Sequence, residues 1–421
     1  MDKNSFVSIA EKYFKRFPNY QCEINTFLNN IPSLIIVIPS FNEEEISITI
    51  NSLFFDQQPH YFNVEIIVLI NNSLDASLKI KDTNRSTLHF LKDFANKNNT
   101  SNLSLHSLYV ADLKPKHAGV GWARKIGMDI ALRRFMNSSN NGVIVGLDAD
   151  AEVSPNYFNS IYAFFKKGDY NAASIHFEHP INGNHFSDFQ YEYIIAYELH
   201  LRYYKNVLAY AGFPFAFHTV GSSFALTALA YARQGGMNRR KAGEDFYFIN
   251  KLIKGENFGE ILDAKVIPSP RISERVPFGT GRAILKAFKG EKDLNLTYDF
   301  RIFIILKNWI KLICSNEFEY ANFPDEIRAY INENEWLETH QEIQNNISDH
   351  KNYLKRFFAK YDAFWVLKFV HFMRDNLRPN SSLVVNVDLL LKALNMFCLI
   401  NKRDQLIDLR KLDMKKGAGA P

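Results

Sequence analysis

Short apolar runs alternate with longer amphipathic segments between residues 34 and 148. The runs are almost continuous in valine, isoleucine and leucine, as parallel strands buried on both faces of a sheet require. These predicted strands cover residues 34–39, 64–70, 103–110 and 143–148. Apolar residues at helical spacing predict helices over 43–55, 77–96 and 120–136. The alternation predicts an α/β fold built on a doubly wound sheet.

The pattern changes after Pro155. It predicts a helix over 157–166, a strand over 172–177, a long aromatic helix over 189–210, a strand over 219–226 and a helix from about Glu244. From about residue 285 the sequence is helical and aromatic without strand signals. We therefore predict four parts: an N-terminal helical extension (1–32), an α/β domain (33–284), a mostly helical C-terminal region (285–416) and a flexible tail (417–421).

Composition and charge narrow the class of protein. The 421 residues are 47% hydrophobic, enough for a large core, and 50 basic against 45 acidic residues leave a net charge of +5. That charge is too small and dispersed to indicate a nucleic-acid partner. Cys22, Cys314 and Cys398 form no CxxC pair, which is typical of a reducing compartment. With no signal-peptide pattern and with charges interrupting the most apolar stretches, we expect a cytoplasmic protein, and peripheral contact with the inner face of a membrane stays open.

Polar side chains follow three of the predicted strands. Carboxyl ends of parallel strands share one edge of a sheet, so the segments 39–42, 71–73 and 148–150 are expected to lie on one rim. Asp148 and Asp150 would offer oxygen ligands to Mg²⁺ or Mn²⁺ beside a diphosphate. The alternative is that these acids only favour the start of a following helix. Short polar residues such as Asn42 and Asn71 could bind a base or ribose, or could simply form turns and caps.

Three further segments carry candidate chemistry. Gly121 and Arg124 open a helix, where glycines let backbone N–H groups approach a phosphate, although no complete phosphate-loop fingerprint is present. Glu244 and Asp245 precede an apolar helix, and such carboxylates serve either as a general base or as a helix cap. The segment 269–282 contains Arg271, Arg275 and Arg282, which suit either a mobile diphosphate-binding loop or a solvated connector.

Together these pieces resemble the family 2 glycosyltransferases with a GT-A fold. The matching stretches are IVIPSFNEEE, VLINNS, HAGVGWARKIGMDIA, GLDADAEV and GGMNRRKAGEDFYF, in the family's order over about residues 33–255. The resemblance implies a GT-A-type, Rossmann-like mixed sheet. It also implies transfer of a sugar, with inversion, from a nucleoside diphosphate sugar to a hydroxyl acceptor in glycan, polysaccharide or glycolipid synthesis. A UDP-sugar is favoured over a GDP-sugar.

The family's roles carry over residue by residue. Nucleotide binding is assigned to Pro39, Phe41, Asn42, Glu43, Asn71, Asn72, Gly121, Arg124 and Asp148. The divalent metal, Mn²⁺ or Mg²⁺, is assigned to Asp148 and Asp150, with His218 as a candidate third ligand. Asp245 is expected to be the base, with Glu244 beside it. Two departures from the family pattern leave the nucleotide open: asparagines stand at 71 and 72 where acids are usual, and Lys125 stands where the family has asparagine.

Two other functions suit the same residues. A catalytically idle protein that binds a sugar nucleotide or glycan could keep the fold, but it would have little use for both acidic pairs. A sugar-phosphate nucleotidyltransferase uses similar metal and carboxylate chemistry and releases pyrophosphate rather than a nucleoside diphosphate. The histidines at 176 and 179 do not indicate a zinc site, because their odd spacing along a strand points them to opposite faces.

Overall fold

A computed structural model describes residues 3–17, 24, 30–115, 118–238, 243–275, 279–345, 347, 349–397 and 401–416. Contacts divide the chain into two units: a first unit, Met1–Gln190 with Thr219–Leu285, and a second unit, Tyr191–His218 with Lys286–Pro421. Residues 191–218, which fall inside the predicted 33–284 domain, therefore group with the later helices. The predicted tail at 417–421 lies outside the described residues. Within the described ranges, no helix has the length and apolar composition needed to cross a membrane.

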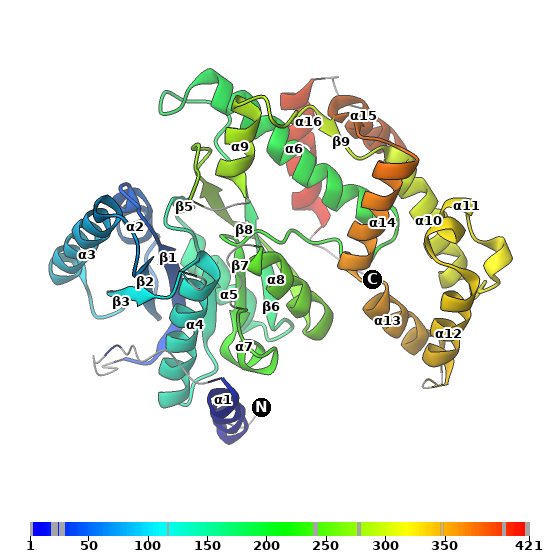
Figure 1. Cartoon of the computed structure of the whole chain (residues 1–421). Coiled ribbons are helices and arrows are strands. Elements are labelled where there is room, and N and C mark those ends of the chain that lie inside the picture. The colour runs from blue at the N-terminus through cyan, green and yellow to red at the C-terminus, as the bar shows by residue number, and fades with distance from the viewer. Residues whose placement is uncertain are drawn as a thin grey trace. The chain divides into compact units, whose positions relative to one another are not determined.

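The first unit is built on one mixed sheet of eight strands in the order β3-β2-β1-β4-β7-β6-β8-β5. Figure 1 shows the chain with its helices and strands labelled. The strands are β1 (Pro32–Ser40), β2 (Asn63–Ser73), β3 (Leu103–Leu113), β4 (Val143–Gly146), β5 (Ala151–Val153), β6 (Ala172–Phe177), β7 (Phe224–Thr227) and β8 (Phe258–Pro268). Its helices are α1 (Lys3–Arg16), α2 (Ile46–Phe54), α3 (Leu78–Asn98), α4 (Val120–Asn137), α5 (Tyr157–Lys166), α7 (Ala228–Arg233) and α8 (Glu244–Gly255). Helix α9 (Thr280–Phe288) follows the sheet and crosses the division between units.

The strand order reverses between β1 and β4. Strands β1, β2, β3 and β4 are mutually parallel, and the chain runs outward from β1 to β3 before α4 returns it to β4 on the other side of β1. Because such crossovers are right-handed, α2 and α3 cover one face of the sheet and α4 covers the other. Both faces of β1 are therefore buried, which explains its continuous apolar run. Ligands of open α/β sheets bind at this reversal of strand order.

The predicted α/β class, with a mixed sheet and a helical C-terminal region, is confirmed. The four apolar runs between residues 34 and 148 are all strands. Strand β4 stops at Gly146, so Asp148 lies just beyond its end, and the strand predicted from residue 219 begins only at Phe224. Sequence analysis missed β8, whose residues are alternately more and less buried, and the three-residue β5 that pairs with it.

Helix α1 is fastened to the sheet domain through a buried polar cluster. The hydroxyl groups of Tyr13 and Tyr231 donate to Oδ1 of Asp129 at 2.6 and 2.7 Å. Lys125 Nζ lies 3.0 Å from the other oxygen of Asp129 and donates to the Tyr13 hydroxyl at 2.6 Å. Lys125, the departure from the family's asparagine, thus stands where α4 meets the N-terminal helix.

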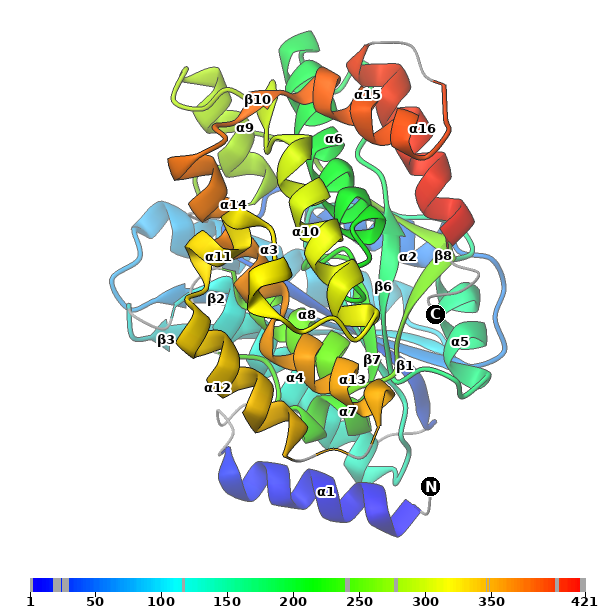
Figure 2. The same ribbon diagram turned by 90° about the vertical axis from the view of Figure 1, so that its right-hand side faces the viewer.

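The second unit is helical, as predicted for residues beyond 285 (Figure 2). It contains α6 (Asp188–Tyr210), β9 (Leu296–Thr297), α10 (Phe300–Cys314), the 3-10 turn η1 (Tyr320–Asn322), α11 (Asp325–Tyr330), α12 (Glu333–Gln344), α13 (His350–Lys360), α14 (Ala363–Asn376), β10 (Ser381–Ser382), α15 (Leu383–Ala393) and α16 (Lys402–Lys416). Two tryptophans, Trp309 and Trp336, are almost fully buried among other aromatic rings in its core. Tyr203 of α6 packs edge-on against Phe303 of α10, which shows why α6 groups with this unit.

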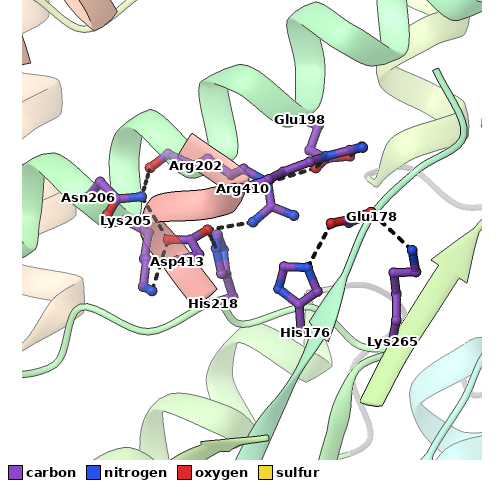
Figure 3. A network of polar contacts seen from close by, with 10 residues as sticks. All are labelled: His176, Glu178, Glu198, Arg202, Lys205, Asn206, His218, Lys265, Arg410 and Asp413. Carbon is purple, nitrogen blue, oxygen red and sulfur yellow. Dashed lines mark hydrogen bonds and ion pairs between the residues drawn. The ribbon is translucent and has the colours of Figure 1, made fainter. Parts of the chain in front are cut away.

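A buried ionic network joins α6 to α16 in the second unit (Figure 3). Both oxygens of Asp413 on α16 are used. Oδ1 accepts hydrogen bonds from Lys205 at 3.1 Å and Asn206 at 2.8 Å. Oδ2 lies 2.5 Å from Arg202 Nη1 and 3.2 Å from His218 Nε2. Through its Nε, Arg202 also donates to Glu198 at 2.7 Å, and Glu198 binds Arg410 of α16 with both oxygens at 2.8 Å.

Candidate active site

One asparagine from α3 ties together the ends of β1 and β2. Oδ1 of the buried Asn84 accepts a hydrogen bond from the backbone N–H of Asn42 at 2.9 Å. Its Nδ2 donates to the carbonyl of Asn71 at 3.2 Å and to Oδ1 of Asn72 at 3.1 Å. Asn42 has a φ of 49°, a left-handed conformation in which asparagine is enriched. Asn84 therefore holds this turn and the neighbouring strand end in one arrangement.

The side chain of Asn72 already has partners on both of its polar atoms. Besides Asn84, its Oδ1 accepts from the Tyr109 hydroxyl at 2.5 Å, and its Nδ2 donates to the carbonyls of Ser73 and Ala111 at 2.9 and 3.1 Å. It is fully buried. The contact of Asn72 with a base or ribose stays a prediction, and these bonds give it a part in supporting the rim.

Arg124 connects the Asp148–Asp150 motif to the acidic pair formed by Glu244 and Asp245. Its guanidinium, only 3% exposed, contacts Oδ1 of Asp148 through Nη2 and Oε1 of Glu244 through Nη1. Asp148 follows β4, whereas Glu244 is the first residue of α8, so the contact joins two segments distant in sequence. Asp245 is less buried than Glu244, and its Oδ1 accepts from the backbone N–H of Phe246 at 2.8 Å.

A second cluster joins the arginine segment to the end of β1. Arg271 binds both carboxylate oxygens of Glu43 and lies 2.6 Å from Oδ2 of Asp150. Arg275 lies 2.7 Å from Glu43 Oε2 and donates to the carbonyl oxygen of Phe41 at 3.2 Å. Glu43 is 1% exposed, whereas the side chain of Asp150 is 29% exposed. Two of the three predicted arginines are thus on the rim, beside the second aspartate of the metal motif.

Burial makes several of these carboxyl groups more basic than usual. It raises the pKa of Asp150 to about 6, although the charge of Arg271 opposes the shift. Burial likewise raises the pKa of Glu244 to about 7, against the influence of Arg124, and raises the pKa of Asp245. For Arg124, burial alone would lower the pKa, but Asp148, Glu244 and Asp245 together raise it, so the guanidinium stays charged.

Unsatisfied polar atoms gather on the same rim. In the described part of the chain, eight buried side-chain atoms have no hydrogen-bond partner, and four belong to this region: Ser40 Oγ, Asn42 Oδ1, Arg124 Nε and Arg271 Nε. A buried polar atom without a partner costs free energy unless a ligand or ordered water completes it. Their concentration at this edge of the sheet indicates a polar ligand site.

The residues present suit a hard divalent cation. Asp148 and Asp150 are 39% and 29% exposed at the end of β4, so both carboxylates can be reached from solvent. Mg²⁺ is commonly held by one or two carboxylates together with substrate phosphates and water. Within the described residues, no group of three or more His, Cys, Asp or Glu could hold a metal by itself. The two aspartates therefore fit a metal that arrives with a diphosphate.

The remaining predicted site residues are placed as follows. Pro39 is buried at the end of β1, Phe41 is half-buried, and Gly121 is buried in the first turn of α4. Arg282, on α9, lies 4.0 Å from Glu274 and does not join the Arg271 cluster. His218 groups with the second unit and pairs with Asp413, so its role as a third metal ligand stays a prediction.

Sequence reasoning missed two residues of the site. Asn84 lies at a buried position of the amphipathic helix α3. A polar residue on the apolar side of this helix is the pattern in the sequence that could have identified it. Gly221 lies against the acidic cluster: a Cβ added there would lie 2.7 Å from Asp245 Oδ2 and 2.9 Å from both terminal nitrogens of Arg124. Only the folded chain identifies that close approach.

Comparison with solved structures finds similar chains at low identity. Staphylococcus aureus TarS 1–349 in complex with UDP-GlcNAc is 15% identical with a TM-score of 0.39, over 74% of this chain and 81% of that one. GalNAc-T7 with UDP, GalNAc and Mn²⁺ is 13% identical with a TM-score of 0.37, over 83% of this chain and 59% of that one. The match spans 60% of the chain in another crystal structure of TarS 1–349. No curated protein matches the sequence.

Two family models match the part of the chain that carries the site. The model "Glycosyl transferase family 2" matches residues 35–223, which include the β1 rim and the Asp148–Asp150 motif. The model "Glycosyl transferase family group 2" matches residues 143–310, which extend through Glu244, Asp245 and the arginine segment. Every carboxylate of the two clusters falls within these matches. The predicted resemblance of this part of the chain to the family 2 glycosyltransferases is therefore confirmed.

Proposed function

We propose that this glycosyltransferase is metal-dependent and inverting, and that it moves a sugar from a UDP-sugar to a hydroxyl group of an acceptor during polysaccharide, glycan or glycolipid synthesis. The observation that carries the proposal is the gathering of Asp148, Asp150, Glu244 and Asp245 near the reversal of strand order between β1 and β4, beside four unsatisfied polar atoms. The cytoplasmic location and contact with a membrane remain predictions from the sequence.

Donor binding is assigned to the end of β4 and the arginine segment. Asp148 and Asp150 would hold Mn²⁺ or Mg²⁺, which would neutralise charge on the departing diphosphate. Arg271 and Arg275 are cations already beside Asp150. They are suited to bind diphosphate oxygens, because guanidinium groups match the geometry of phosphate. The alternative is that segment 269–282 is only a solvated connector. Measuring donor binding by the arginine variants of this segment distinguishes the two roles.

Asp245 is the better candidate for the base. Glu244 is 2% exposed and its carboxylate is engaged by Arg124, so an acceptor hydroxyl has little access to it. Asp245 is more exposed, and burial raises its pKa, which strengthens it as a proton acceptor. In the proposed step, Asp245 accepts the proton of the acceptor hydroxyl while the oxygen of that hydroxyl forms a bond to the anomeric carbon of the donor sugar. The bond to the diphosphate breaks on the opposite face, which inverts that carbon.

The proposal is tested with Asp245→Asn and Glu244→Gln, using a panel of nucleotide sugars and hydroxyl acceptors with Mn²⁺. Asp245→Asn should lower kcat by roughly 10²–10⁴-fold, because an amide cannot accept the proton, while donor affinity changes little. Glu244→Gln is the corresponding carboxylate-to-amide change at the neighbouring residue and should lower kcat less than Asp245→Asn does. UDP release coupled to acceptor glycosylation would support the proposal. Pyrophosphate release, or binding without turnover by the unmodified chain, would refute it.

A further inference from the structure

The guanidinium of Arg124 is surrounded by carboxylates from two separate segments. Its Nη2 donates a hydrogen bond to Asp148 and its Nη1 donates one to Glu244. Asp245 adds a third negative charge that acts on the same guanidinium. With its side chain 3% exposed and both terminal nitrogens engaged within the protein, Arg124 has only its Nε left for a ligand or an ordered water. This arrangement differs from the nucleotide-binding role that the family resemblance assigns to Arg124.

Gly221 shows how closely these groups are packed. Its Cα faces Asp245 Oδ2 and both terminal nitrogens of Arg124, so that even one methyl group would approach all three within 3 Å. A Cβ at position 221 would therefore require the ends of the Asp245 and Arg124 side chains to shift. The missing side chain at position 221 thus leaves the space in which Arg124 and Asp245 lie together.

The charge of Arg124 stabilises the three carboxylates that surround it. Asp148, Glu244 and Asp245 repel one another when ionised, and one buried cation among them offsets part of that repulsion. Because Arg124 binds Asp148 and Glu244 through separate nitrogens of one rigid plane, it also fixes the spacing between the end of β4 and the start of α8. In the proposed function, these two ends carry the metal ligand and the base.

We propose that Arg124 is a positioning residue that holds the metal-binding carboxylate Asp148 and the base Asp245 at a fixed separation, with Gly221 providing the space for this contact. The inference rests on the proposed function. Arg124 acts through Asp148 and Glu244, which engage both of its terminal nitrogens. Its loss therefore affects the alignment of donor and acceptor in the transition state more than the affinity for the nucleotide.

Arg124→Lys is the first test, because it keeps the charge but cannot engage two carboxylates in one plane. We expect kcat to fall by about 10²-fold, the effect of misplacing reacting groups by about 1 Å. The dissociation constant for UDP with Mn²⁺, measured by calorimetry, should stay within about threefold of the value for the unmodified chain. That change is smaller than the roughly tenfold change in affinity expected from the loss of a direct contact with UDP. A loss of UDP affinity with unchanged kcat would assign Arg124 to the nucleotide and overturn the inference.

Gly221→Ala is the second test, because it adds a single carbon and removes no charged group. It should lower kcat while preserving UDP affinity, as Arg124→Lys does. Ser222→Ala, at the neighbouring buried position, removes an atom instead and is the matched control. Equal kcat values for Gly221→Ala and Ser222→Ala would contradict the inference even if Arg124→Lys fails to fold. No turnover by the unmodified chain would instead refute the proposed function, so the two failures are distinguishable.

Discussion

Asp413 is the residue whose removal should most clearly destabilise the second unit (Figure 3). Its carboxylate is 3% exposed and receives polar contacts from Arg202, Lys205, Asn206 and His218. Burial alone would raise its pKa, but the hydrogen bond from His218 and the charges of Lys205 and Arg202 hold the pKa well below its usual range. The ionised carboxylate is therefore strongly stabilised in the folded chain.

The expected size of the effect follows from these contacts. Asp413→Ala leaves the buried Lys205 and Arg202 without their shared carboxylate, although Arg202 keeps Glu198. Removing one partner of a buried ionic network costs about 3–5 kcal/mol. In a unit of this size, each kcal/mol lowers Tm by about 2–4 °C, so we expect a fall of about 6–20 °C. Asp408→Ala on the same helix loses a partly exposed pair with Lys411 and should lower the free energy of unfolding by about 0.2–1 kcal/mol.

Tryptophan fluorescence is a suitable measurement, because three of the four tryptophans, at positions 309, 336 and 365, belong to the second unit. Urea titrations of the Asp413→Ala and Asp408→Ala variants compare their free energies of unfolding directly. The contribution of Asp413 should be present above its unfolded pKa of about 3.9 and should disappear as the pH falls through its lower folded pKa. Equal stability of the two variants at pH 7 would refute the reasoning.

Two further predictions concern donor binding. Asp148→Asn and Asp150→Asn should abolish the Mn²⁺-dependent thermal stabilisation by a UDP-sugar, about 2.7 kcal/mol at one hundred times its dissociation constant, whereas the exposed Asp169→Asn should keep it. Since burial raises the pKa of Asp150 to about 6, Mn²⁺ binding should weaken below about pH 6, and a pH-independent affinity would contradict its ligand role. Arg271→Ala and Arg275→Ala should weaken UDP-sugar binding in calorimetry more than Arg282→Ala does, because only the first two join the Asp150 cluster. In the unmodified chain, donor and Mn²⁺ should protect the segment that carries Arg271 and Arg275 from protease, and ligand-independent cleavage would support the connector alternative.

The sequence by itself was sufficient to predict the parts of the fold that depend on local pattern. Continuous apolar runs predicted the parallel strands from β1 to β4, because a strand buried on both faces has no polar side. The motifs at the ends of these strands predicted which residues share the rim, since parallel strands end on the same edge of a sheet. The order of the motifs along the chain was enough to predict the glycosyltransferase family.

Tertiary structure alone decided the pairing between distant segments. Nothing near Arg124 in the sequence indicates that it meets Asp148 and Glu244, and nothing near Arg202 indicates that it meets Asp413 on the last helix. Helix α6 looks like any aromatic helix in sequence, yet its contacts place it with the later helices. Residue types and spacing specify local conformation. Which buried charges neutralise one another depends on how the sheet order and the helix packing bring remote side chains together.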